Sequence, residues 1–291
     1  MASEASPQNR MRSLNLIGFM QGRFSPLIDG RIQAFPWAHW RDEFPIAQQN
    51  GFRLMEWTLD QNRLYENPLL TSAGQAEIIA LCRRHDLRIK SLTGDCFMQE
   101  PFWKTNGKNS EDLKKDFSAV VDACSVVGIT MIVVPLVDNG RIENAEQEMA
   151  LVTFLESQSK ILTERGVQVV FESDFGSSEL ARFVGRLDCK LFGVNYDIGN
   201  SAAVGFDPVE EFGAYGNRIM NVHVKDRVLG GTTVPLGTGH ADFKTVFAGL
   251  NRLGYTGNYI LQTARTGDGQ HATALCHYRD MTIDWLTRHT N

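Results

Sequence analysis

The run Val169-Val170-Phe171-Glu172 is a short apolar segment that ends in a carboxylate, and the chain repeats this pattern. The other runs are Val194-Asn195-Tyr196-Asp197, Met220-Asn221-Val222-His223 and Tyr259-Ile260-Leu261-Gln262. If the four segments are parallel strands of a barrel, their carboxyl ends present these polar side chains to one point. Carboxylates and imidazole are good ligands for a divalent metal, and the amide of Gln262 offers a further oxygen. The pattern therefore predicts a shared metal site.

Strand-like and helix-like segments alternate along the chain. After a polar tail over residues 1–13, which we expect to be disordered, the predicted strands cover residues 14–20, 53–58, 88–92, 130–137, 167–172, 192–197, 219–225 and 258–262. A helical pattern follows each strand, and glycines such as Gly128 and Gly166 mark helix ends. About eight such units are the count of a (β/α)8 TIM barrel, so we predict one barrel domain over residues 14–291. A doubly wound open sheet is the alternative, but no Gly-x-Gly-x-x-Gly motif follows the first strand.

The composition excludes several classes of protein. The 291 residues carry a formal net charge of −5 and contain no run of Lys and Arg, so we expect no nucleic-acid partner. The longest apolar stretch is too short to cross a membrane, and the opening residues lack the apolar centre of a secretion signal. We therefore expect a cytoplasmic protein that binds a small molecule, with a homo-oligomer left open. The five scattered cysteines predict reduced thiols.

Further polar residues stand near the predicted strand ends. Glu56 closes the second strand, either as a buried partner of a neighbouring group or as a catalytic residue. Asp95, just past the third strand, is interpreted as a turn residue. Lys225 lies two positions beyond His223, hence on the same side of the strand, where it could meet an anionic substrate group or neutralise a carboxylate. His240 lies in the loop after the seventh strand, within reach of a barrel mouth.

A phosphate-binding region is a second hypothesis for this end of the chain. The loop Pro235-Leu236-Gly237-Thr238-Gly239 offers backbone N–H groups, and Lys225, Arg227 and Arg265 lie in loops that often hold phosphate in barrels. The alternative is an ordinary turn with exposed basic residues. The three basic residues are therefore candidates for substrate binding.

At these motifs the chain resembles the xylose-isomerase-like barrel superfamily, and within it the sugar and sugar-phosphate isomerases and 3-epimerases. The motifs that carry the resemblance are Gly51-Phe52-Arg53-Leu54-Met55-Glu56, Tyr196-Asp197-Ile198-Gly199-Asn200, Asn221-Val222-His223-Val224-Lys225-Asp226, the loop 235–239 with Asp242-Phe243, and Gly254-Tyr255-Thr256-Gly257. Together they span most of the chain.

The resemblance implies a divalent metal, Mn²⁺, Mg²⁺, Co²⁺ or Zn²⁺. Its ligands would be Glu172, Asp197, His223 and a fourth residue at the end of the eighth strand. In the family this fourth residue is a Glu, and the two Glu residues act as acid and base on opposite faces of the sugar. Here the position is Gln262. An amide keeps an oxygen ligand but removes one negative charge, and it cannot accept a proton at neutral pH.

The resulting hypothesis is a metal-dependent isomerase or epimerase of a sugar or sugar phosphate. Glu172 would move a proton through a metal-stabilised enediolate, with Gln262 as a neutral ligand or hydrogen-bond donor. Glu56 and His240 are the candidates for the second base. Two alternatives remain: a dehydratase-type lyase acting on a keto-sugar or inosose, and a sugar-binding protein that lost turnover with its fourth carboxylate.

Overall fold

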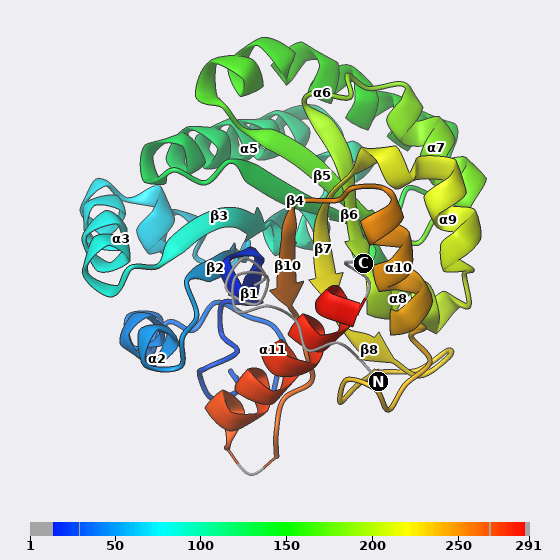
Figure 1. The fold of residues 1–291 in the computed structure, drawn as a ribbon. Helices are drawn as coiled ribbons and strands as arrows, with labels where there is room; N and C mark the ends of the chain where they lie inside the picture. The colour runs from blue at the N-terminus through cyan, green and yellow to red at the C-terminus, as the bar shows by residue number, and fades with distance from the viewer. Residues whose placement is uncertain (1–13, 29, 268, 289–291) are drawn as a thin grey trace.

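Eight parallel strands close into a barrel in the computed structural model, which describes residues 14–28, 30–267 and 269–288 (Figure 1). Their order around the barrel is β1-β10-β7-β6-β5-β4-β3-β2, so strands that follow one another in the βα units lie side by side. The strands are β1 Ile17–Met20, β2 Leu54–Thr58, β3 Arg88–Thr93, β4 Met131–Leu136, β5 Gln168–Ser173, β6 Phe192–Asp197, β7 Ile219–Val224 and β10 Asn258–Leu261. The predicted TIM barrel is confirmed. The predicted tail over residues 1–13 lies outside the described residues.

Helices cover the outside of the barrel, with a longer helix following each of its strands (Figure 1). They are α2 Glu43–Gln49, α3 Ser72–His85, α5 Gly107–Val127, α6 Ala145–Arg165, α7 Ser177–Gly185, α9 Pro208–Tyr215, α10 Phe243–Arg252 and α11 His271–Arg288. Gly128 and Gly166 end α5 and α6 with φ of 84° and 66°, a left-handed conformation that glycine adopts without steric cost. None of the helices in the described part of the chain is both long and apolar enough to span a membrane.

Short additional elements follow the carboxyl ends of three strands, and the sequence pattern did not predict them. They are α4 Asp95–Gln99 after β3, α8 Ile198–Val204 after β6, and the antiparallel pair β8 Asp226–Arg227 and β9 Thr233–Val234 after β7. Short 3-10 turns occupy η1 Leu64–Glu66, η2 Pro68–Leu70, η3 Phe102–Lys104, η4 Asp138–Gly140 and η5 Gly216–Arg218. The first strand begins three residues later than predicted, because residues 14–16 form a helical turn.

The strand register places two of the predicted polar residues, Asp197 and His223, directly beside each other. Asp197 of β6 pairs with His223 of β7, while Glu172 of β5 pairs with Pro135 of β4. Side chains alternate along a strand, so the residue two positions before each polar residue shares its side. Three of these residues, Leu54, Val170 and Ile260, are apolar. They belong to two small buried clusters separate from the main core: Met20, Leu54 and Ile260, and Met131, Val133 and Val170. Apolar residues therefore lie beneath Glu56, Glu172 and Gln262, whereas Asn195 and Asn221 lie beneath Asp197 and His223.

Candidate functional site

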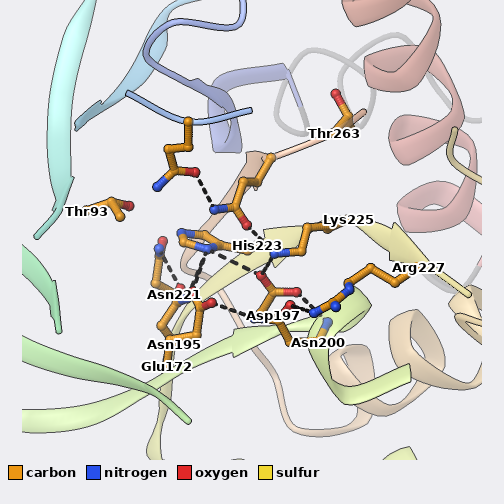
Figure 2. Close-up of polar contacts among 12 residues, drawn as sticks. Thr93, Glu172, Asn195, Asp197, Asn200, Asn221, His223, Lys225, Arg227 and Thr263 are labelled. Atoms are coloured by element: carbon orange, nitrogen blue, oxygen red, sulfur yellow. Dashed lines mark hydrogen bonds and ion pairs between the residues drawn. The ribbon is translucent and has the colours of Figure 1, made fainter. Parts of the chain in front are cut away.

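Three of the four predicted strand-end residues meet at the mouth of the barrel. Glu172, Asp197 and His223 come from β5, β6 and β7, and one ligand atom of each lies within 4.8 Å of the others. Figure 2 shows the three side chains converging from neighbouring strands, and all three are buried. The barrel thus brings two carboxylates and an imidazole to one point.

The imidazole of His223 lies between three carboxylates. Its Nε2 is 2.7 Å from Glu56 Oε1, whereas its Nδ1 is 3.1 Å from Glu172 Oε2 and 3.8 Å from Asp197 Oδ2. A carboxylate on one ring nitrogen holds the proton there and leaves the lone pair of the other nitrogen for a ligand. We therefore infer that Glu56 orients His223 so that Nδ1 faces the other two carboxylates.

Glu56 is held from all sides in the barrel interior. It is 0% exposed, and besides His223 it accepts hydrogen bonds from Thr93 Oγ1 at 2.5 Å and Asn221 Nδ2 at 3.0 Å. Burial acts to raise the pKa of Glu56, but the adjacent His223 outweighs it, and the pKa lies below its usual value. The surroundings of Glu56 favour the interpretation as a buried partner over the catalytic one.

Two asparagines fix the carboxylate of Glu172. Asn200 Nδ2 donates to Oε1 at 2.6 Å, and Asn195 Nδ2 donates to Oε2 at 3.0 Å (Figure 2). Asn221 in turn donates to Asn195 Oδ1 at 2.9 Å. No role was predicted for Asn195 or Asn221 from the sequence. Each stands two positions before a predicted ligand on the same strand, and this spacing is the signal that could have identified them.

Asp197 has one structural oxygen and one oxygen directed at the cluster. Oδ1 accepts the backbone N–H of Asn200 at 2.8 Å and so caps α8. Oδ2 lies 2.8 Å from Lys225 Nζ as an ion pair and 3.8 Å from His223 Nδ1. Burial raises the pKa of Asp197, but Lys225 and His223 lower it more, to well below its usual range. Asp197 is therefore ionised.

The cluster suits a divalent cation. Two carboxylates and an imidazole are oxygen and nitrogen donors of the kind that Mn²⁺, Mg²⁺, Co²⁺ and Zn²⁺ accept. Burial lowers the pKa of His223, but Glu56, Asp197 and Glu172 raise it well above its usual value, so the cluster attracts positive charge. Asp197 Oδ2 is buried at this cluster and is paired with Lys225 Nζ at 2.8 Å, so a bound cation would share this oxygen with the ammonium group.

The fourth predicted residue, Gln262, directly follows β10 and takes part in a chain of polar contacts. Its Oε1 accepts a hydrogen bond from Lys225 Nζ at 2.8 Å, and its Nε2 donates to Gln33 Oε1 at 2.7 Å. Lys225 pairs at the same time with Asp197. Because Lys225 can only donate, the oxygen of Gln262 points toward it and the amide nitrogen points away.

A cavity of about 470 Å³ opens beside this cluster, a volume in the range of small-molecule sites. Glu172, Lys225 and Gln262 line it, together with polar residues from other strand ends. The further lining residues are Gln33, Thr93, Asp95, Met98, Gln99, Pro135, Val137, Asp138, Arg141, Asp174, Asn200, Ala203, Val204, Arg227 and Gly230. Glu56, Arg265 and His240 are not among the described residues that line the cavity.

The basic residues predicted for substrate binding are paired within the protein. Arg227 lines the cavity, but its guanidinium donates to Gly231 O at 2.7 Å and to Asn200 Oδ1 at 2.8 Å (Figure 2). Arg265 donates to the backbone oxygens of Ser25 and Ile32. Lys225, as described above, pairs with Asp197 and Gln262. Of the three, Arg227 and Lys225 therefore border the cavity, and both have internal partners.

The loop considered for phosphate binding surrounds a carboxylate of the protein itself. The backbone N–H groups of Gly237, Gly239 and Ala241 donate to Asp226 at 2.9, 2.8 and 3.1 Å. These donors are therefore occupied. His240 lies in the same segment and is exposed, and its Nδ1 accepts a backbone N–H.

Asp95 differs most from its predicted environment. It was predicted to be a turn residue, but it is the first residue of α4, is 6% exposed and lines the cavity. Gln33 Nε2 donates to its Oδ2 at 2.6 Å. Sequence spacing carries no signal for this burial, because the position depends on how the loops after β1 and β3 pack together.

Comparison with known families agrees with this architecture. A family model described as xylose isomerase-like TIM barrel matches residues 44–280, and the chain belongs to this family. The predicted resemblance is thereby confirmed. Residues 44–280 include Glu172, Asp197, His223 and Gln262, whereas Gln33 precedes the matched range.

The relatives and structural neighbours include several sugar-processing enzymes. An inosose dehydratase from Geobacillus kaustophilus is 28% identical over 172 residues, 51% of this chain and 56% of that protein, so the match spans little more than half of its length. The crystal structure of D-psicose 3-epimerase with D-tagatose from Clostridium cellulolyticum H10 has a TM-score of 0.72 at 13% identity, covering 94% of this chain and 99% of that one. The structure of IolI protein with a bound zinc atom has a TM-score of 0.71 at 15% identity, covering 94% and 98%. At these identities the structural likenesses establish the fold.

Proposed function

We propose that this protein is a divalent-metal-dependent isomerase or epimerase that moves a proton at a carbon next to the carbonyl group of a sugar. The observation that carries the proposal is the buried cluster of Glu172, Asp197 and His223. One member of this cluster, Glu172, also lines the cavity. A carboxylate that borders both a cation site and a substrate cavity can act on a carbon whose carbonyl oxygen the cation polarises.

Glu172, Asp197 and His223 would hold the metal, and Gln262 would offer its oxygen as a fourth ligand. When bound, the ion supplies a Lewis acid that makes the carbon next to the carbonyl more acidic. Glu172 is the group that takes the proton, and Asn195 and Asn200 keep its carboxylate in place.

A substrate without a phosphate group fits the cavity better than a phosphorylated one. Lys225 and Arg227 line the cavity but are already paired, and the N–H groups of the neighbouring loop donate to Asp226. Gln33, Thr93 and Gln99 also have internal partners, but their amide and hydroxyl groups each keep a further donor or acceptor site for a sugar hydroxyl.

Dehydration of a keto-sugar or inosose is the second candidate. It is favoured by the match to the inosose dehydratase and by Gln262, because an amide cannot serve as the second base of a two-base epimerisation. A dehydratase would use the same Glu172 to remove the proton and would then expel a hydroxyl from the neighbouring carbon.

The test uses metal-free protein to which Mn²⁺ or Mg²⁺ is added, with ketoses, their phosphates and inososes as substrates in D₂O. NMR should show metal-dependent incorporation of deuterium at the carbon next to the carbonyl, and Glu172→Gln should abolish it. Ultraviolet absorption from an unsaturated product would identify the dehydratase. If no substrate in the panel takes up solvent deuterium, the proposal fails.

A further inference from the structure

Asp95 lies on the cavity wall near the end of β3, whereas the candidate metal ligands come from β5, β6 and β7. It follows the end of β3 after Gly94, and in the barrel order three strands separate β3 from β7 in either direction. It therefore faces His223 across the barrel and stands two strands away from Glu172. Asp95 and Glu172 line the same cavity. A substrate in this cavity would have a carboxyl group on each of two sides.

A chain of hydrogen bonds positions the Asp95 carboxyl group. Lys225 fixes the orientation of Gln262, whose Nε2 donates to Gln33 Oε1, so that the Gln33 amide nitrogen is free to donate to Asp95 Oδ2. Among the described residues, Gln33 is the donor to this carboxyl group, and Oδ1 is left for a substrate. The residue that replaces the family's fourth Glu thus helps to hold a carboxyl group on the other side of the cavity.

The surroundings of Asp95 keep a proton on it near neutral pH. Burial raises its pKa, Gln33 lowers it, and the charges of Asp60 and Glu172 raise it further, to about 7. The remaining charged group that acts on it is Arg23, from the loop after β1, which lowers the pKa. A carboxyl group that is half protonated at neutral pH can donate a proton and recover it from solvent.

We propose that Asp95 is the second catalytic acid–base residue of this site and donates a proton to the substrate from the side away from Glu172. The proposal rests on the proposed function. Asp95 would supply the acid–base group that the amide of Gln262 cannot supply. It takes the place of the two candidates predicted from the sequence, Glu56 and His240, neither of which borders the cavity.

The proton balance is the same for both candidate reactions. Glu172 takes a proton from the carbon next to the carbonyl as that C–H bond breaks. In an epimerisation, Asp95 gives its proton to the opposite face of the same carbon. In a dehydration, it gives its proton to the departing hydroxyl, the C–O bond breaks and water leaves. In both cases Glu172 then releases its proton to solvent and Asp95 takes one up, so no other reactant is needed.

The test separates proton removal from product formation with the variants Asp95→Asn and Glu172→Gln. Because Glu172 can remove a proton, exchange it with D₂O and return it without Asp95, Asp95→Asn should exchange the substrate hydrogen within about threefold of the wild-type rate. Its product formation should fall about 10²–10⁴-fold, the usual contribution of an acid–base group. Glu172→Gln should lose both. Glu100→Gln, which removes an exposed carboxylate at the other end of α4, should lose neither.

Wild-type protein provides an independent measurement, should Asp95→Asn not fold. Product formation should fall as the pH rises through about 7, because Asp95 then loses the proton it must donate, while hydrogen exchange should not show this decrease. Product formation by folded Asp95→Asn within threefold of wild type, or identical pH profiles for the two wild-type rates, would overturn the inference. Absence of exchange in the wild type would refute the proposed function and this inference with it.

Discussion

Replacing Glu56 by Gln tests the orientation of His223 and hence the metal site. The Glu56 carboxylate accepts from His223 and Thr93 through one oxygen and from Asn221 through the other. A Gln side chain has one oxygen and one NH₂ group, so it cannot accept on both sides. Either Asn221 or His223 then faces a second donor, and in both cases the negative charge behind the imidazole is lost.

The expected result is weaker metal binding in a protein that still folds. Removing the outer partner of a metal-bound His usually costs about 10–100-fold in metal affinity, which corresponds to roughly 1.4–2.7 kcal/mol. Glu56 is 0% exposed, so water cannot take the place of the lost acceptor. We therefore expect Glu56→Gln to bind Mn²⁺ at least about tenfold more weakly than wild type in calorimetric titrations.

The control is another buried carboxylate far from the cluster. Glu148 on α6 is 7% exposed and pairs with Arg182 and Arg186 on the outside of the barrel. Glu148→Gln should lower the urea midpoint of unfolding but leave the affinity for Mn²⁺ unchanged. A folded Glu56→Gln variant that binds Mn²⁺ as tightly as wild type would refute the inferred role of Glu56.

Two further predictions concern Gln262 and Asp95, which both line the cavity. Gln262→Glu should tighten Mn²⁺ binding about tenfold, since an ionised ligand adds charge to the site; an unchanged affinity in the same titration would show that this side chain does not reach the ion. The second prediction is a pH dependence of stability. The pKa of Asp95 is about 7 in the folded protein, against about 3.9 in the unfolded chain. Folding therefore favours the protonated form, and stability falls as the pH rises from about 4 to about 7 and is constant above. In urea unfolding, wild type should lose at least about 1 kcal/mol more than Asp95→Asn over this window, and equal losses would contradict the burial of the Asp95 carboxyl group.

The fold was predictable because its signals are local. Glycines such as Gly128 and Gly166 end helices through their own backbone conformation, and an apolar run that ends in a polar residue identifies a strand of a parallel barrel without knowledge of its partners. The predicted strand over 192–197 coincides with β6, and the helix that ends at Gly166 is α6. The additional helix α8 was missed because it starts directly at the strand end, capped by the same Asp197 that closes β6.

The site was predictable only in part, because its inner contacts join distant segments. The positions of Glu172, Asp197 and His223 follow from strand alternation and register. The hydrogen bond between His223 and Glu56 joins residues 167 positions apart and exists only because the barrel closes. The sequence likewise could not predict that the backbone N–H groups of Gly237 and Gly239 donate to Asp226, because it indicates only a glycine-containing loop.

The sequence by itself therefore determined the eight βα units and the row of polar side chains at the ends of four strands, since both depend on neighbours a few positions away. Tertiary structure decided which of these groups meet. It places the Glu56 carboxylate at Nε2 of His223 and pairs Lys225 with Asp197 and Gln262. It also buries Asp95 at the wall of the cavity. The physical reason is that burial and charge pairing, which govern the chemistry of these side chains, depend on groups that only the closed barrel brings together.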